Sequence, residues 1–118
     1  MTDNMSGSLR ISTEVIAKIA KVAALEIDGI DAVVAPSQSI RGLLGSPKQQ
    51  KPIRVEMKDD LAEITVHVKV AYGTKVNLVG EKAQENIKAA VQNMTGITVS
   101  RVNIVVEAIS VEPEENAD

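Results

Sequence analysis

Few residues in this chain are of the types that carry out chemistry. His67 is the sole histidine among the 118 residues, and there is no cysteine. His67 alternates with Thr65 and Lys69, which predicts a position on the polar side of a strand. Glu63 shares that side, but four residues of extended chain place it about 13 Å from His67, too far for direct proton relay. We therefore expect an exposed sheet histidine and neither a metal site nor a thiol nucleophile.

The carboxylates are spread along the chain and form no pair suited to acid–base catalysis. They occur as Asp59 and Asp60 in a predicted turn, as Glu81 and Glu85 on a helix face, and as Glu112, Glu114 and Glu115 near the end. Two acids that hydrolyse a glycoside should converge on a cleft. No serine has a plausible base beside it in the sequence. The sequence predicts no catalytic residues, no cofactor and a protein that is not an enzyme.

Two glycine-containing stretches could bind phosphate groups. G-L-L-G at 42–45 is a G-x-x-G pattern, which in KH domains clamps a nucleic-acid backbone. G-T-K at 73–75 has the residues that end a phosphate loop, but in the wrong order and without the upstream glycine. The first pattern gives an alternative interpretation, a nucleic-acid-binding module that uses Arg41, Gly42, Gly45 and Lys48. The formal net charge of −3 argues against nucleic acid as a partner.

The composition limits the class of protein further. Hydrophobic residues make up 44% of the chain, yet there is no Phe or Trp and Tyr72 is the single aromatic residue. One aliphatic core fits a chain of this length, and one ring gives no platform on which bases or sugars could stack. The first residues lack the basic and apolar regions of a signal peptide. No stretch approaches the ~18 apolar residues of a membrane-spanning helix. We expect a cytoplasmic protein with no direct membrane span.

Two amphipathic helices are predicted from the spacing of apolar residues. The first has a stripe formed by Ile16, Ile19, Ala20, Ala23 and Ile27. Ser12 precedes it as a candidate N-cap. The second has a stripe of nearly five turns formed by Val76, Val79, Ala83, Ile87, Ala90 and Met94. Thr74 is its candidate N-cap, and Gly96 is expected to end it.

Strands are predicted where apolar and polar residues alternate. The stretches 53–58 and 63–70 form a hairpin about the turn at 59–60. The last strand, at about 98–111, places Val102, Ile104, Val106 and Ala108 on its apolar face. Further short strands are expected near 9–11 and 30–34. The fold class is α+β, a two-layer sandwich in the order α-β-β-α-β, with both helices packed on one face of a small mixed sheet.

The connection between the last two strands contains a helix, so these strands should be parallel if they lie in one sheet. The chain divides into a flexible N-terminus at 1–8, a single α+β domain at 9–111 and a disordered acidic tail at 112–118. Apolar side chains on the outward face or edge of the last strand, Val105, Ile109 and Val111, are candidates for an interaction surface. Tyr72, at the joint between a strand and a helix, is a fourth candidate because tyrosine is enriched at interfaces.

Several longer stretches occur together in a specific order. They are E-V-I-A-K-I-A-K-V-A-A-L-E-I-D-G-I at 14–30, L-L-G at 43–45, I-R-V-E at 53–56, V-H-V-K-V-A-Y-G-T-K-V at 66–76 and A-V-Q-N-M-T-G-I-T-V-S-R-V-N-I-V-V at 90–106. Together they resemble the alkaline shock (general stress) protein family of Gram-positive bacteria. The resemblance spans roughly 9–109. One departure is Ile87, which stands where valine is more usual and preserves an apolar core position.

The resemblance implies a cytosolic, non-catalytic scaffold or adaptor in the cell-envelope stress response and envelope homeostasis. Family members self-associate, which implies a homo-oligomer. Some are held at the inner face of the membrane by a membrane-anchored partner of the same family. Some relatives are associated with lipid-metabolism genes, so a regulator linked to lipid metabolism is an alternative. The family has no agreed active site, and no functional residues are carried over from it.

Overall fold

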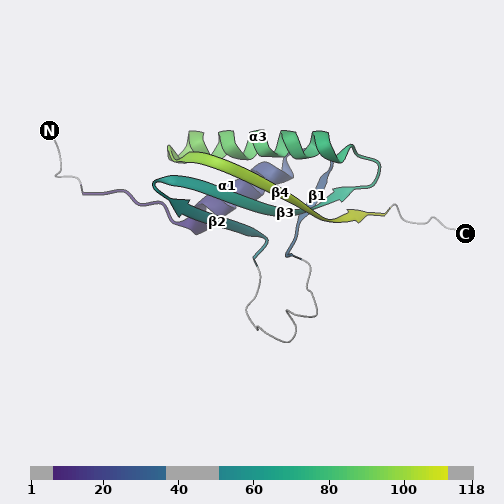
Figure 1. The fold of residues 1–118 in the computed structure, drawn as a ribbon, viewed down its shortest axis with the longest axis horizontal. Coiled ribbons are helices and arrows are strands. Elements are labelled where there is room, and N and C mark those ends of the chain that lie inside the picture. Colours follow the sequence, from purple (N-terminus) through teal and green to yellow (C-terminus); the bar gives the residue numbers. More distant parts are fainter. Residues whose placement is uncertain (1–6, 37–50, 112–118) are drawn as a thin grey trace, which may run out of the picture.

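The computed structural model describes residues 7–36 and 51–111. Its elements, in chain order, are α1 (Thr13–Leu25), β1 (Ile30–Val33), β2 (Ile53–Lys58), β3 (Leu61–Ala71), α3 (Val76–Thr95) and β4 (Thr98–Ser110). Both helices pack on one face of a four-stranded sheet (Figure 1). The predicted two-layer α+β class is confirmed. The strand expected near 30–34 is present as β1, whereas residues 9–11 form no strand, so that expectation was wrong.

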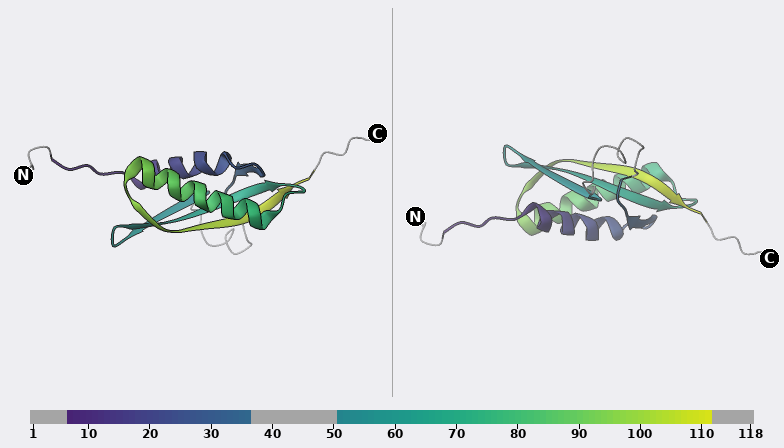
Figure 2. Two further views of the ribbon diagram at one scale, coloured as in Figure 1. Left: turned by 90° about the horizontal axis from the view of Figure 1, so that it is seen from above. Right: turned by 90° about the horizontal axis from the view of Figure 1, so that it is seen from below.

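The sheet is mixed and is built around β3. β2 pairs antiparallel with the first half of β3, from Ile53↔Val66 to Lys58↔Leu61. β1 pairs antiparallel with the second half. β4 runs parallel to β3 along its whole length, which confirms the predicted parallel pair. Because a strand has only two edges, β1 and β2 lie end to end along one edge of β3 and β4 occupies the other (Figure 2).

The core lies between the helices and one face of the sheet, which we call the core face. Alternate residues of β3 are fully buried there: Ala62, Ile64, Val66, Val68 and Val70. The helices contribute Ile16, Ala20, Ala23 and Ala24 from α1 and Val79, Ala83, Ile87 and Val91 from α3. Alanines on α1 leave room for the close approach of α3, and Asn86 of α3 donates hydrogen bonds to the Ala23 carbonyl (2.8 Å) and to Glu26 (2.9 Å).

The helix ends follow the sequence prediction in two places and depart from it in a third. The Ser12 hydroxyl accepts a hydrogen bond from the Val15 N–H and caps α1. Gly96 ends α3 in the left-handed conformation, with a φ of 77°. Thr74 is not the N-cap of α3, and its hydroxyl donates back to the carbonyl of Ala71 at 2.7 Å. The N-cap position falls on Lys75, which makes no side-chain cap hydrogen bond.

The turn between β2 and β3 is a two-residue hairpin. Asp59 and Asp60 have φ angles of 54° and 67°. Positive φ at both central residues matches the twist of the flanking strands, and aspartate tolerates it better than most residues. The turn fixes the register in which Arg54, Glu56 and Lys58 share a face with the polar side chains of β3. The predicted hairpin is confirmed.

Two irregularities in β4 could not be anticipated from its alternating sequence. The pairing with β3 skips Ser100 and Glu107, which marks β-bulges at these positions. Each bulge shifts the alternation by one residue, so Ala108 aligns with Lys69 on the face away from the helices. The prediction that Ala108 lies on the apolar face was therefore wrong, and Ile109 takes that side instead. The limits proposed for the domain, 9–111, stay a prediction.

Candidate functional site

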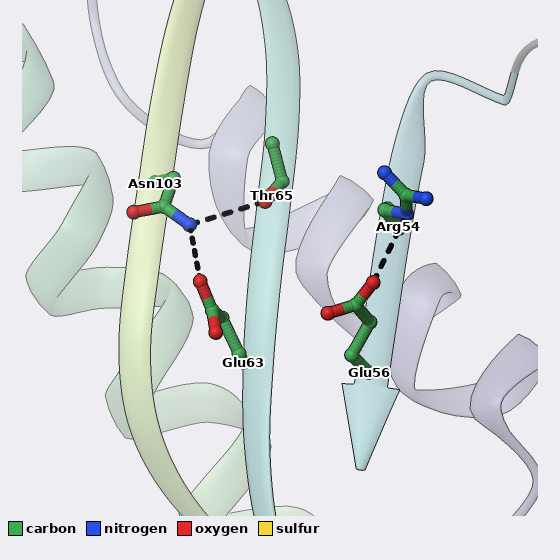
Figure 3. A network of polar contacts seen from close by, with 5 residues as sticks. All are labelled: Arg54, Glu56, Glu63, Thr65 and Asn103. Atoms are coloured by element: carbon green, nitrogen blue, oxygen red, sulfur yellow. Dashed lines mark hydrogen bonds and ion pairs between the residues drawn. The ribbon is translucent and has the colours of Figure 1, made fainter. Parts of the chain in front are cut away.

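The face of the sheet opposite the helices, which we call the polar face, carries a hydrogen-bonded group at its centre. The Asn103 amide of β4 donates to Glu63 Oε2 at 3.0 Å and to Thr65 Oγ1 at 3.1 Å, both on β3. Figure 3 shows the three side chains on the side of the strands away from the helices. One amide nitrogen thus links β3 to β4 through two side chains. These contacts fix the local surface of the sheet.

Charge on the neighbouring strand is arranged less favourably. Glu56 of β2 lies directly opposite Glu63 of β3, and like charges in such a pair repel each other. The Arg54 guanidinium Nε lies 3.3 Å from Glu56 Oε2 (Figure 3). Arg54 therefore offsets the charge of Glu56 while Asn103 holds Glu63. Both side chains of the Arg54–Glu56 pair are mostly exposed, so water weakens the attraction between them.

His67 makes a contact that the linear sequence did not reveal. Its Nδ1 lies 2.6 Å from Oε2 of Glu107, and the two side chains are only 17% and 14% exposed. An ionised carboxylate can only accept, so Nδ1 carries the proton that is shared in this contact. The bulge at Glu107 brings this carboxylate to the polar face beside His67. The predicted exposed histidine is instead half-buried and paired across two strands.

The His67–Glu107 pair has no further ligand-type neighbours in the described part of the chain. No group of three or more His, Cys, Asp or Glu residues suited to a metal ion occurs within residues 7–36 and 51–111. A histidine and one carboxylate can orient a proton, but a nucleophile or metal is needed for the common hydrolytic mechanisms. The geometry is that of a cross-strand structural contact.

The structure places the four candidate interaction residues in two places. Ala71 aligns with Ser110 at the end of the β3–β4 pair, and Tyr72 and Val111 follow directly in each chain segment. Tyr72 is 69% exposed, Val111 77% and Ile109 50%, so these three mark an exposed apolar end of the sheet. Val105 aligns with His67 on the polar face, four residues before Ile109, and is 37% exposed. Whether these residues bind a partner stays a proposal.

The outer edge of β4 is the longest backbone edge in the described residues that pairs with no other strand. Two side chains of α3 reach it. The Gln84 amide donates to the Val102 carbonyl at 3.1 Å, and the Gln92 carbonyl accepts from the Val99 N–H at 2.9 Å. Nothing in the sequence singled out these glutamines, because their role depends on the position of α3 over β4. They satisfy backbone groups in the first half of the edge.

The two phosphate-binding patterns have different outcomes. Arg41, Gly42, Gly45 and Lys48 lie outside the described residues. At 73–75 the chain forms a turn in which Gly73 has a φ of 91°. The Thr74 hydroxyl donates a hydrogen bond to the Ala71 carbonyl. A shallow hollow beside it is lined by Lys75, Val76, Asn77, Leu78 and Glu81. The residues at 73–75 thus serve as a joint between β3 and α3.

Comparison with known proteins establishes the family. The model of the alkaline shock protein 23 family, described as having a cell envelope-related function, matches residues 1–111. The chain belongs to this family. The match confirms the resemblance to the alkaline shock proteins and gives the chain a cell envelope-related role. No helix within the described residues is long and apolar enough to cross a membrane.

Similar chains occur in Bacillus and Streptococcus. The uncharacterized protein YloU of Bacillus subtilis is 32% identical over 108 residues, which cover 89% of this chain and 90% of that protein. The uncharacterized protein YqhY of the same organism is 31% identical over 103 residues, 86% of this chain and 76% of YqhY. The uncharacterized protein Spy1614 of Streptococcus pyogenes is 28% identical over 108 residues, 89% of each chain.

The fold is also found in solved structures of other proteins. Two structures of the MamM CTD match with TM-scores of 0.51 and 0.52 at 16% and 14% sequence identity. They cover 81% and 82% of this chain and 94% and 99% of their own. At such low identity the likeness establishes the fold alone.

Proposed function

We propose that this alkaline shock family protein is a non-catalytic scaffold in cell-envelope stress and homeostasis, and that it acts by assembling with copies of itself and with protein partners. One observation carries the proposal. β4 presents an outer edge with no strand beside it in the described residues, and this edge ends in the exposed apolar side chains of Ile109 and Val111. Unpaired edges and apolar surface are both association surfaces.

The polar contacts support a non-enzymatic role. The central polar side chains of the sheet, Asn103 and His67, are each held by a neighbour on an adjacent strand and serve to fix that surface. The described residues bring together no metal-binding group. The chemistry they offer is recognition through backbone and apolar contacts.

The place of action is inferred from the family role. We propose a cytoplasmic protein that is recruited to the inner face of the membrane by a membrane-anchored partner of the same fold. A related domain presents similar strands, so the surface that joins two copies of this chain would also suit such a partner. This arrangement connects an envelope-related role with a chain in whose described residues no helix could span a membrane.

Analytical ultracentrifugation at micromolar concentration tests the proposal directly. We expect a dimer or larger assembly that dissociates on dilution. A monomer over the whole concentration range would overturn the self-associating scaffold. Capture of the tagged protein from its native cells, followed by mass spectrometry, should recover the chain itself and a membrane-anchored relative. Salt-sensitive retention of RNA or DNA in the same preparation would instead favour the interpretation based on Arg41 and Lys48.

A further inference from the structure

The hydrogen bonds of β3 determine which backbone N–H and C=O groups of β4 point away from β3, towards the unpaired edge of the sheet. The His67 N–H donates to the Pro52 carbonyl, and the His67 carbonyl accepts from the Val34 N–H. The backbone groups of His67 therefore point towards β1 and β2, and those of the residues on either side of it point towards β4. In a parallel pair, a β3 residue whose backbone groups point towards β4 bonds to the two neighbours of its aligned β4 residue. The backbone groups of that aligned β4 residue therefore point away from β3. We call the β4 residues whose backbone groups point away from β3 the outward residues. They are those aligned with the core residues of β3: Val99, Val102, Ile104, Val106 and Ile109.

The contacts of α3 agree with this assignment. Gln92 binds the N–H of Val99 and Gln84 binds the carbonyl of Val102, and both groups belong to outward residues. The described residues supply no comparable side chain for Ile104 or Val106. The side chains of all five outward residues lie on the core face. Along a strand, the face that carries the side chain and the edge to which the backbone groups point both change at each residue. The edge thus combines free backbone groups with an apolar border of the core.

The strand is symmetric about its midpoint. β4 runs from Thr98 to Ser110, so Ile104 is its central residue. Reversal about Ile104 exchanges Val99 with Ile109 and Val102 with Val106, so the outward set maps onto itself. It also exchanges the two bulged segments, 100–101 and 107–108. An antiparallel copy of this strand would therefore meet it with matching outward groups, matching apolar side chains and matching bulges.

We propose that a second copy of this chain pairs with β4 in antiparallel orientation about a two-fold axis at Ile104, joining two sheets into one continuous sheet. The inference rests on the proposed self-association and specifies its surface and register. In this register Ile104 pairs with its own copy, and the apolar layers of the two domains meet along the axis. A self-complementary patch of this kind closes after two copies.

Charge is complementary in the same register. Reversal about Ile104 places Arg101 opposite Glu107 of the partner copy, and the symmetry repeats the pair on the other side of the axis. Arg101 aligns with Glu63 and Glu107 contacts His67, so both charged residues belong to the polar face. Glu107 keeps its contact with His67 Nδ1 within the chain and gains Arg101 of the partner copy as an ion-pair partner. An antiparallel register shifted by two residues loses this match.

Both α3 glutamines compete with the association in the free chain, Gln92 at the Val99 N–H and Gln84 at the Val102 carbonyl nearer the axis. Pairing directs the Val106 N–H of the partner copy to the Val102 carbonyl, which Gln84 already occupies. A carbonyl oxygen has two lone pairs, but the incoming strand and the glutamine amide compete for the same space. Gln84→Ala should therefore strengthen association about threefold or more, whereas Glu85→Ala, the neighbouring exposed position, should leave it unchanged. Equal association of the two variants would contradict pairing at Val102.

Site-directed spin labels test the register, since the chain has no cysteine that would label elsewhere. With the axis at Ile104, residue 98 and its copy are separated by about 34 Å along the strand, because 98–110 aligns with the ten residue steps from Leu61 to Ala71 at ~3.4 Å each. Residue 105 and its copy are separated by about 7 Å along the strand. We expect strong coupling between labels at Val105→Cys, a long distance for Thr98→Cys, and a short one in a mixture of Thr98→Cys with Ser110→Cys. An assembly with any other distance pattern overturns the register but leaves self-association intact, whereas a monomer overturns both.

Two substitutions test the pairing itself. Val106→Pro removes an outward N–H without removing a bond to β3, so it should abolish the dimer while the far-ultraviolet circular dichroism is unchanged. Arg101→Glu should weaken the dimer at least tenfold, and Arg101→Glu combined with Glu107→Arg should restore most of the loss. Unchanged association in Arg101→Glu, or failure of the double variant when its fold is intact, would contradict the register.

Discussion

The two faces of β3 show how one strand serves two purposes. Its core-face residues, from Ala62 to Val70, are at most 1% exposed and meet only aliphatic neighbours. Its polar-face residues alternate with them but are held by specific cross-strand contacts, such as Asn103 to Glu63 and His67 to Glu107. On the core face, stability comes from volume and burial. On the polar face it comes from individual hydrogen bonds, which can be removed one at a time.

The sharpest contrast between the faces comes from neighbouring positions. Ile64→Ala should lower the free energy of unfolding by about 3–4 kcal/mol, since a fully buried side chain leaves a cavity. Thr65→Ala, one residue on, should cost about 1 kcal/mol through loss of the hydrogen bond from Asn103. Urea denaturation followed by circular dichroism measures both. Equal losses of unfolding free energy in the two variants would contradict the larger contribution of the core face to stability.

Glycines at two junctions extend the contrast to the helix layer. Gly29 has a φ of 105°, and a Cβ there would lie 2.8 Å from Val79 Cγ2 and 3.1 Å from Thr74 Cγ2. Gly29→Ala should therefore cost about 2–3 kcal/mol from backbone strain and overlap. Gly73 also has positive φ, but no atom lies within 4 Å of a Cβ placed there. Gly73→Ala is the matched control and should cost about 1 kcal/mol. A smaller loss at Gly29 than at Gly73 would contradict the close packing of α3 on this turn.

The His67–Glu107 contact should have an intermediate effect. Glu107→Leu should cost about 1–2 kcal/mol, because it leaves a partly buried imidazole without its carboxylate. Glu107 has other neighbours, so a double-mutant cycle with His67→Leu is needed to isolate the pair. We expect a coupling energy of about 1 kcal/mol in thermal or urea unfolding. Additive single effects would mean that the contact does not stabilise the fold.

The smallest effect on the free energy of unfolding is expected on β2, where Arg54 and Glu56 lie on the polar face. The Arg54–Glu56 pair is exposed on both sides, so Arg54→Ala should change the free energy of unfolding by less than about 0.5 kcal/mol. Asn103→Ala provides the comparison, since it removes two hydrogen bonds at the centre of the face and should cost about 1–2 kcal/mol. A larger loss for Arg54 would indicate that Arg54 controls the repulsion between Glu56 and Glu63.

Periodicity accounts for how much of this molecule the sequence predicts. The alternation along 53–70 and the helical spacing from Val79 to Ala90 each indicate a buried face, and the hairpin and α3 formed as predicted. The ends of the predicted α3 stripe were wrong, because Val76 is 38% exposed and Met94 is 71% exposed. The bulge at Glu107 could not be predicted, because an extra residue in one strand leaves no mark in composition. Without the bulge, neither the contact between His67 and Glu107 nor the switch of Ala108 to the polar face follows. Gln84 and Gln92 were missed for a related reason, since a polar residue on a helix does not reveal which neighbour it will contact.

Thr74 shows a different limit of local reasoning. A threonine before a helix is a good N-cap candidate, but here the N-cap position falls one residue later, on Lys75, and the Thr74 hydroxyl donates to the carbonyl of Ala71. The hydroxyl stabilises the exit from β3 and not the entry into α3. Local propensity identified the joint at 71–75 correctly and assigned the hydroxyl to the wrong side of it.

The single ring at this joint leaves the protein with very little intrinsic optical signal from its core. Tyr72 is the only aromatic residue of the chain and is 69% exposed, while the core consists of aliphatic side chains. Near-ultraviolet absorbance and intrinsic fluorescence therefore originate from one phenol that is already largely in water. Loss of the core leaves that signal almost unchanged. A chromophore at the exposed end of the sheet responds instead to whatever comes to lie against β3 and β4, so the chain carries its own optical reporter of docking.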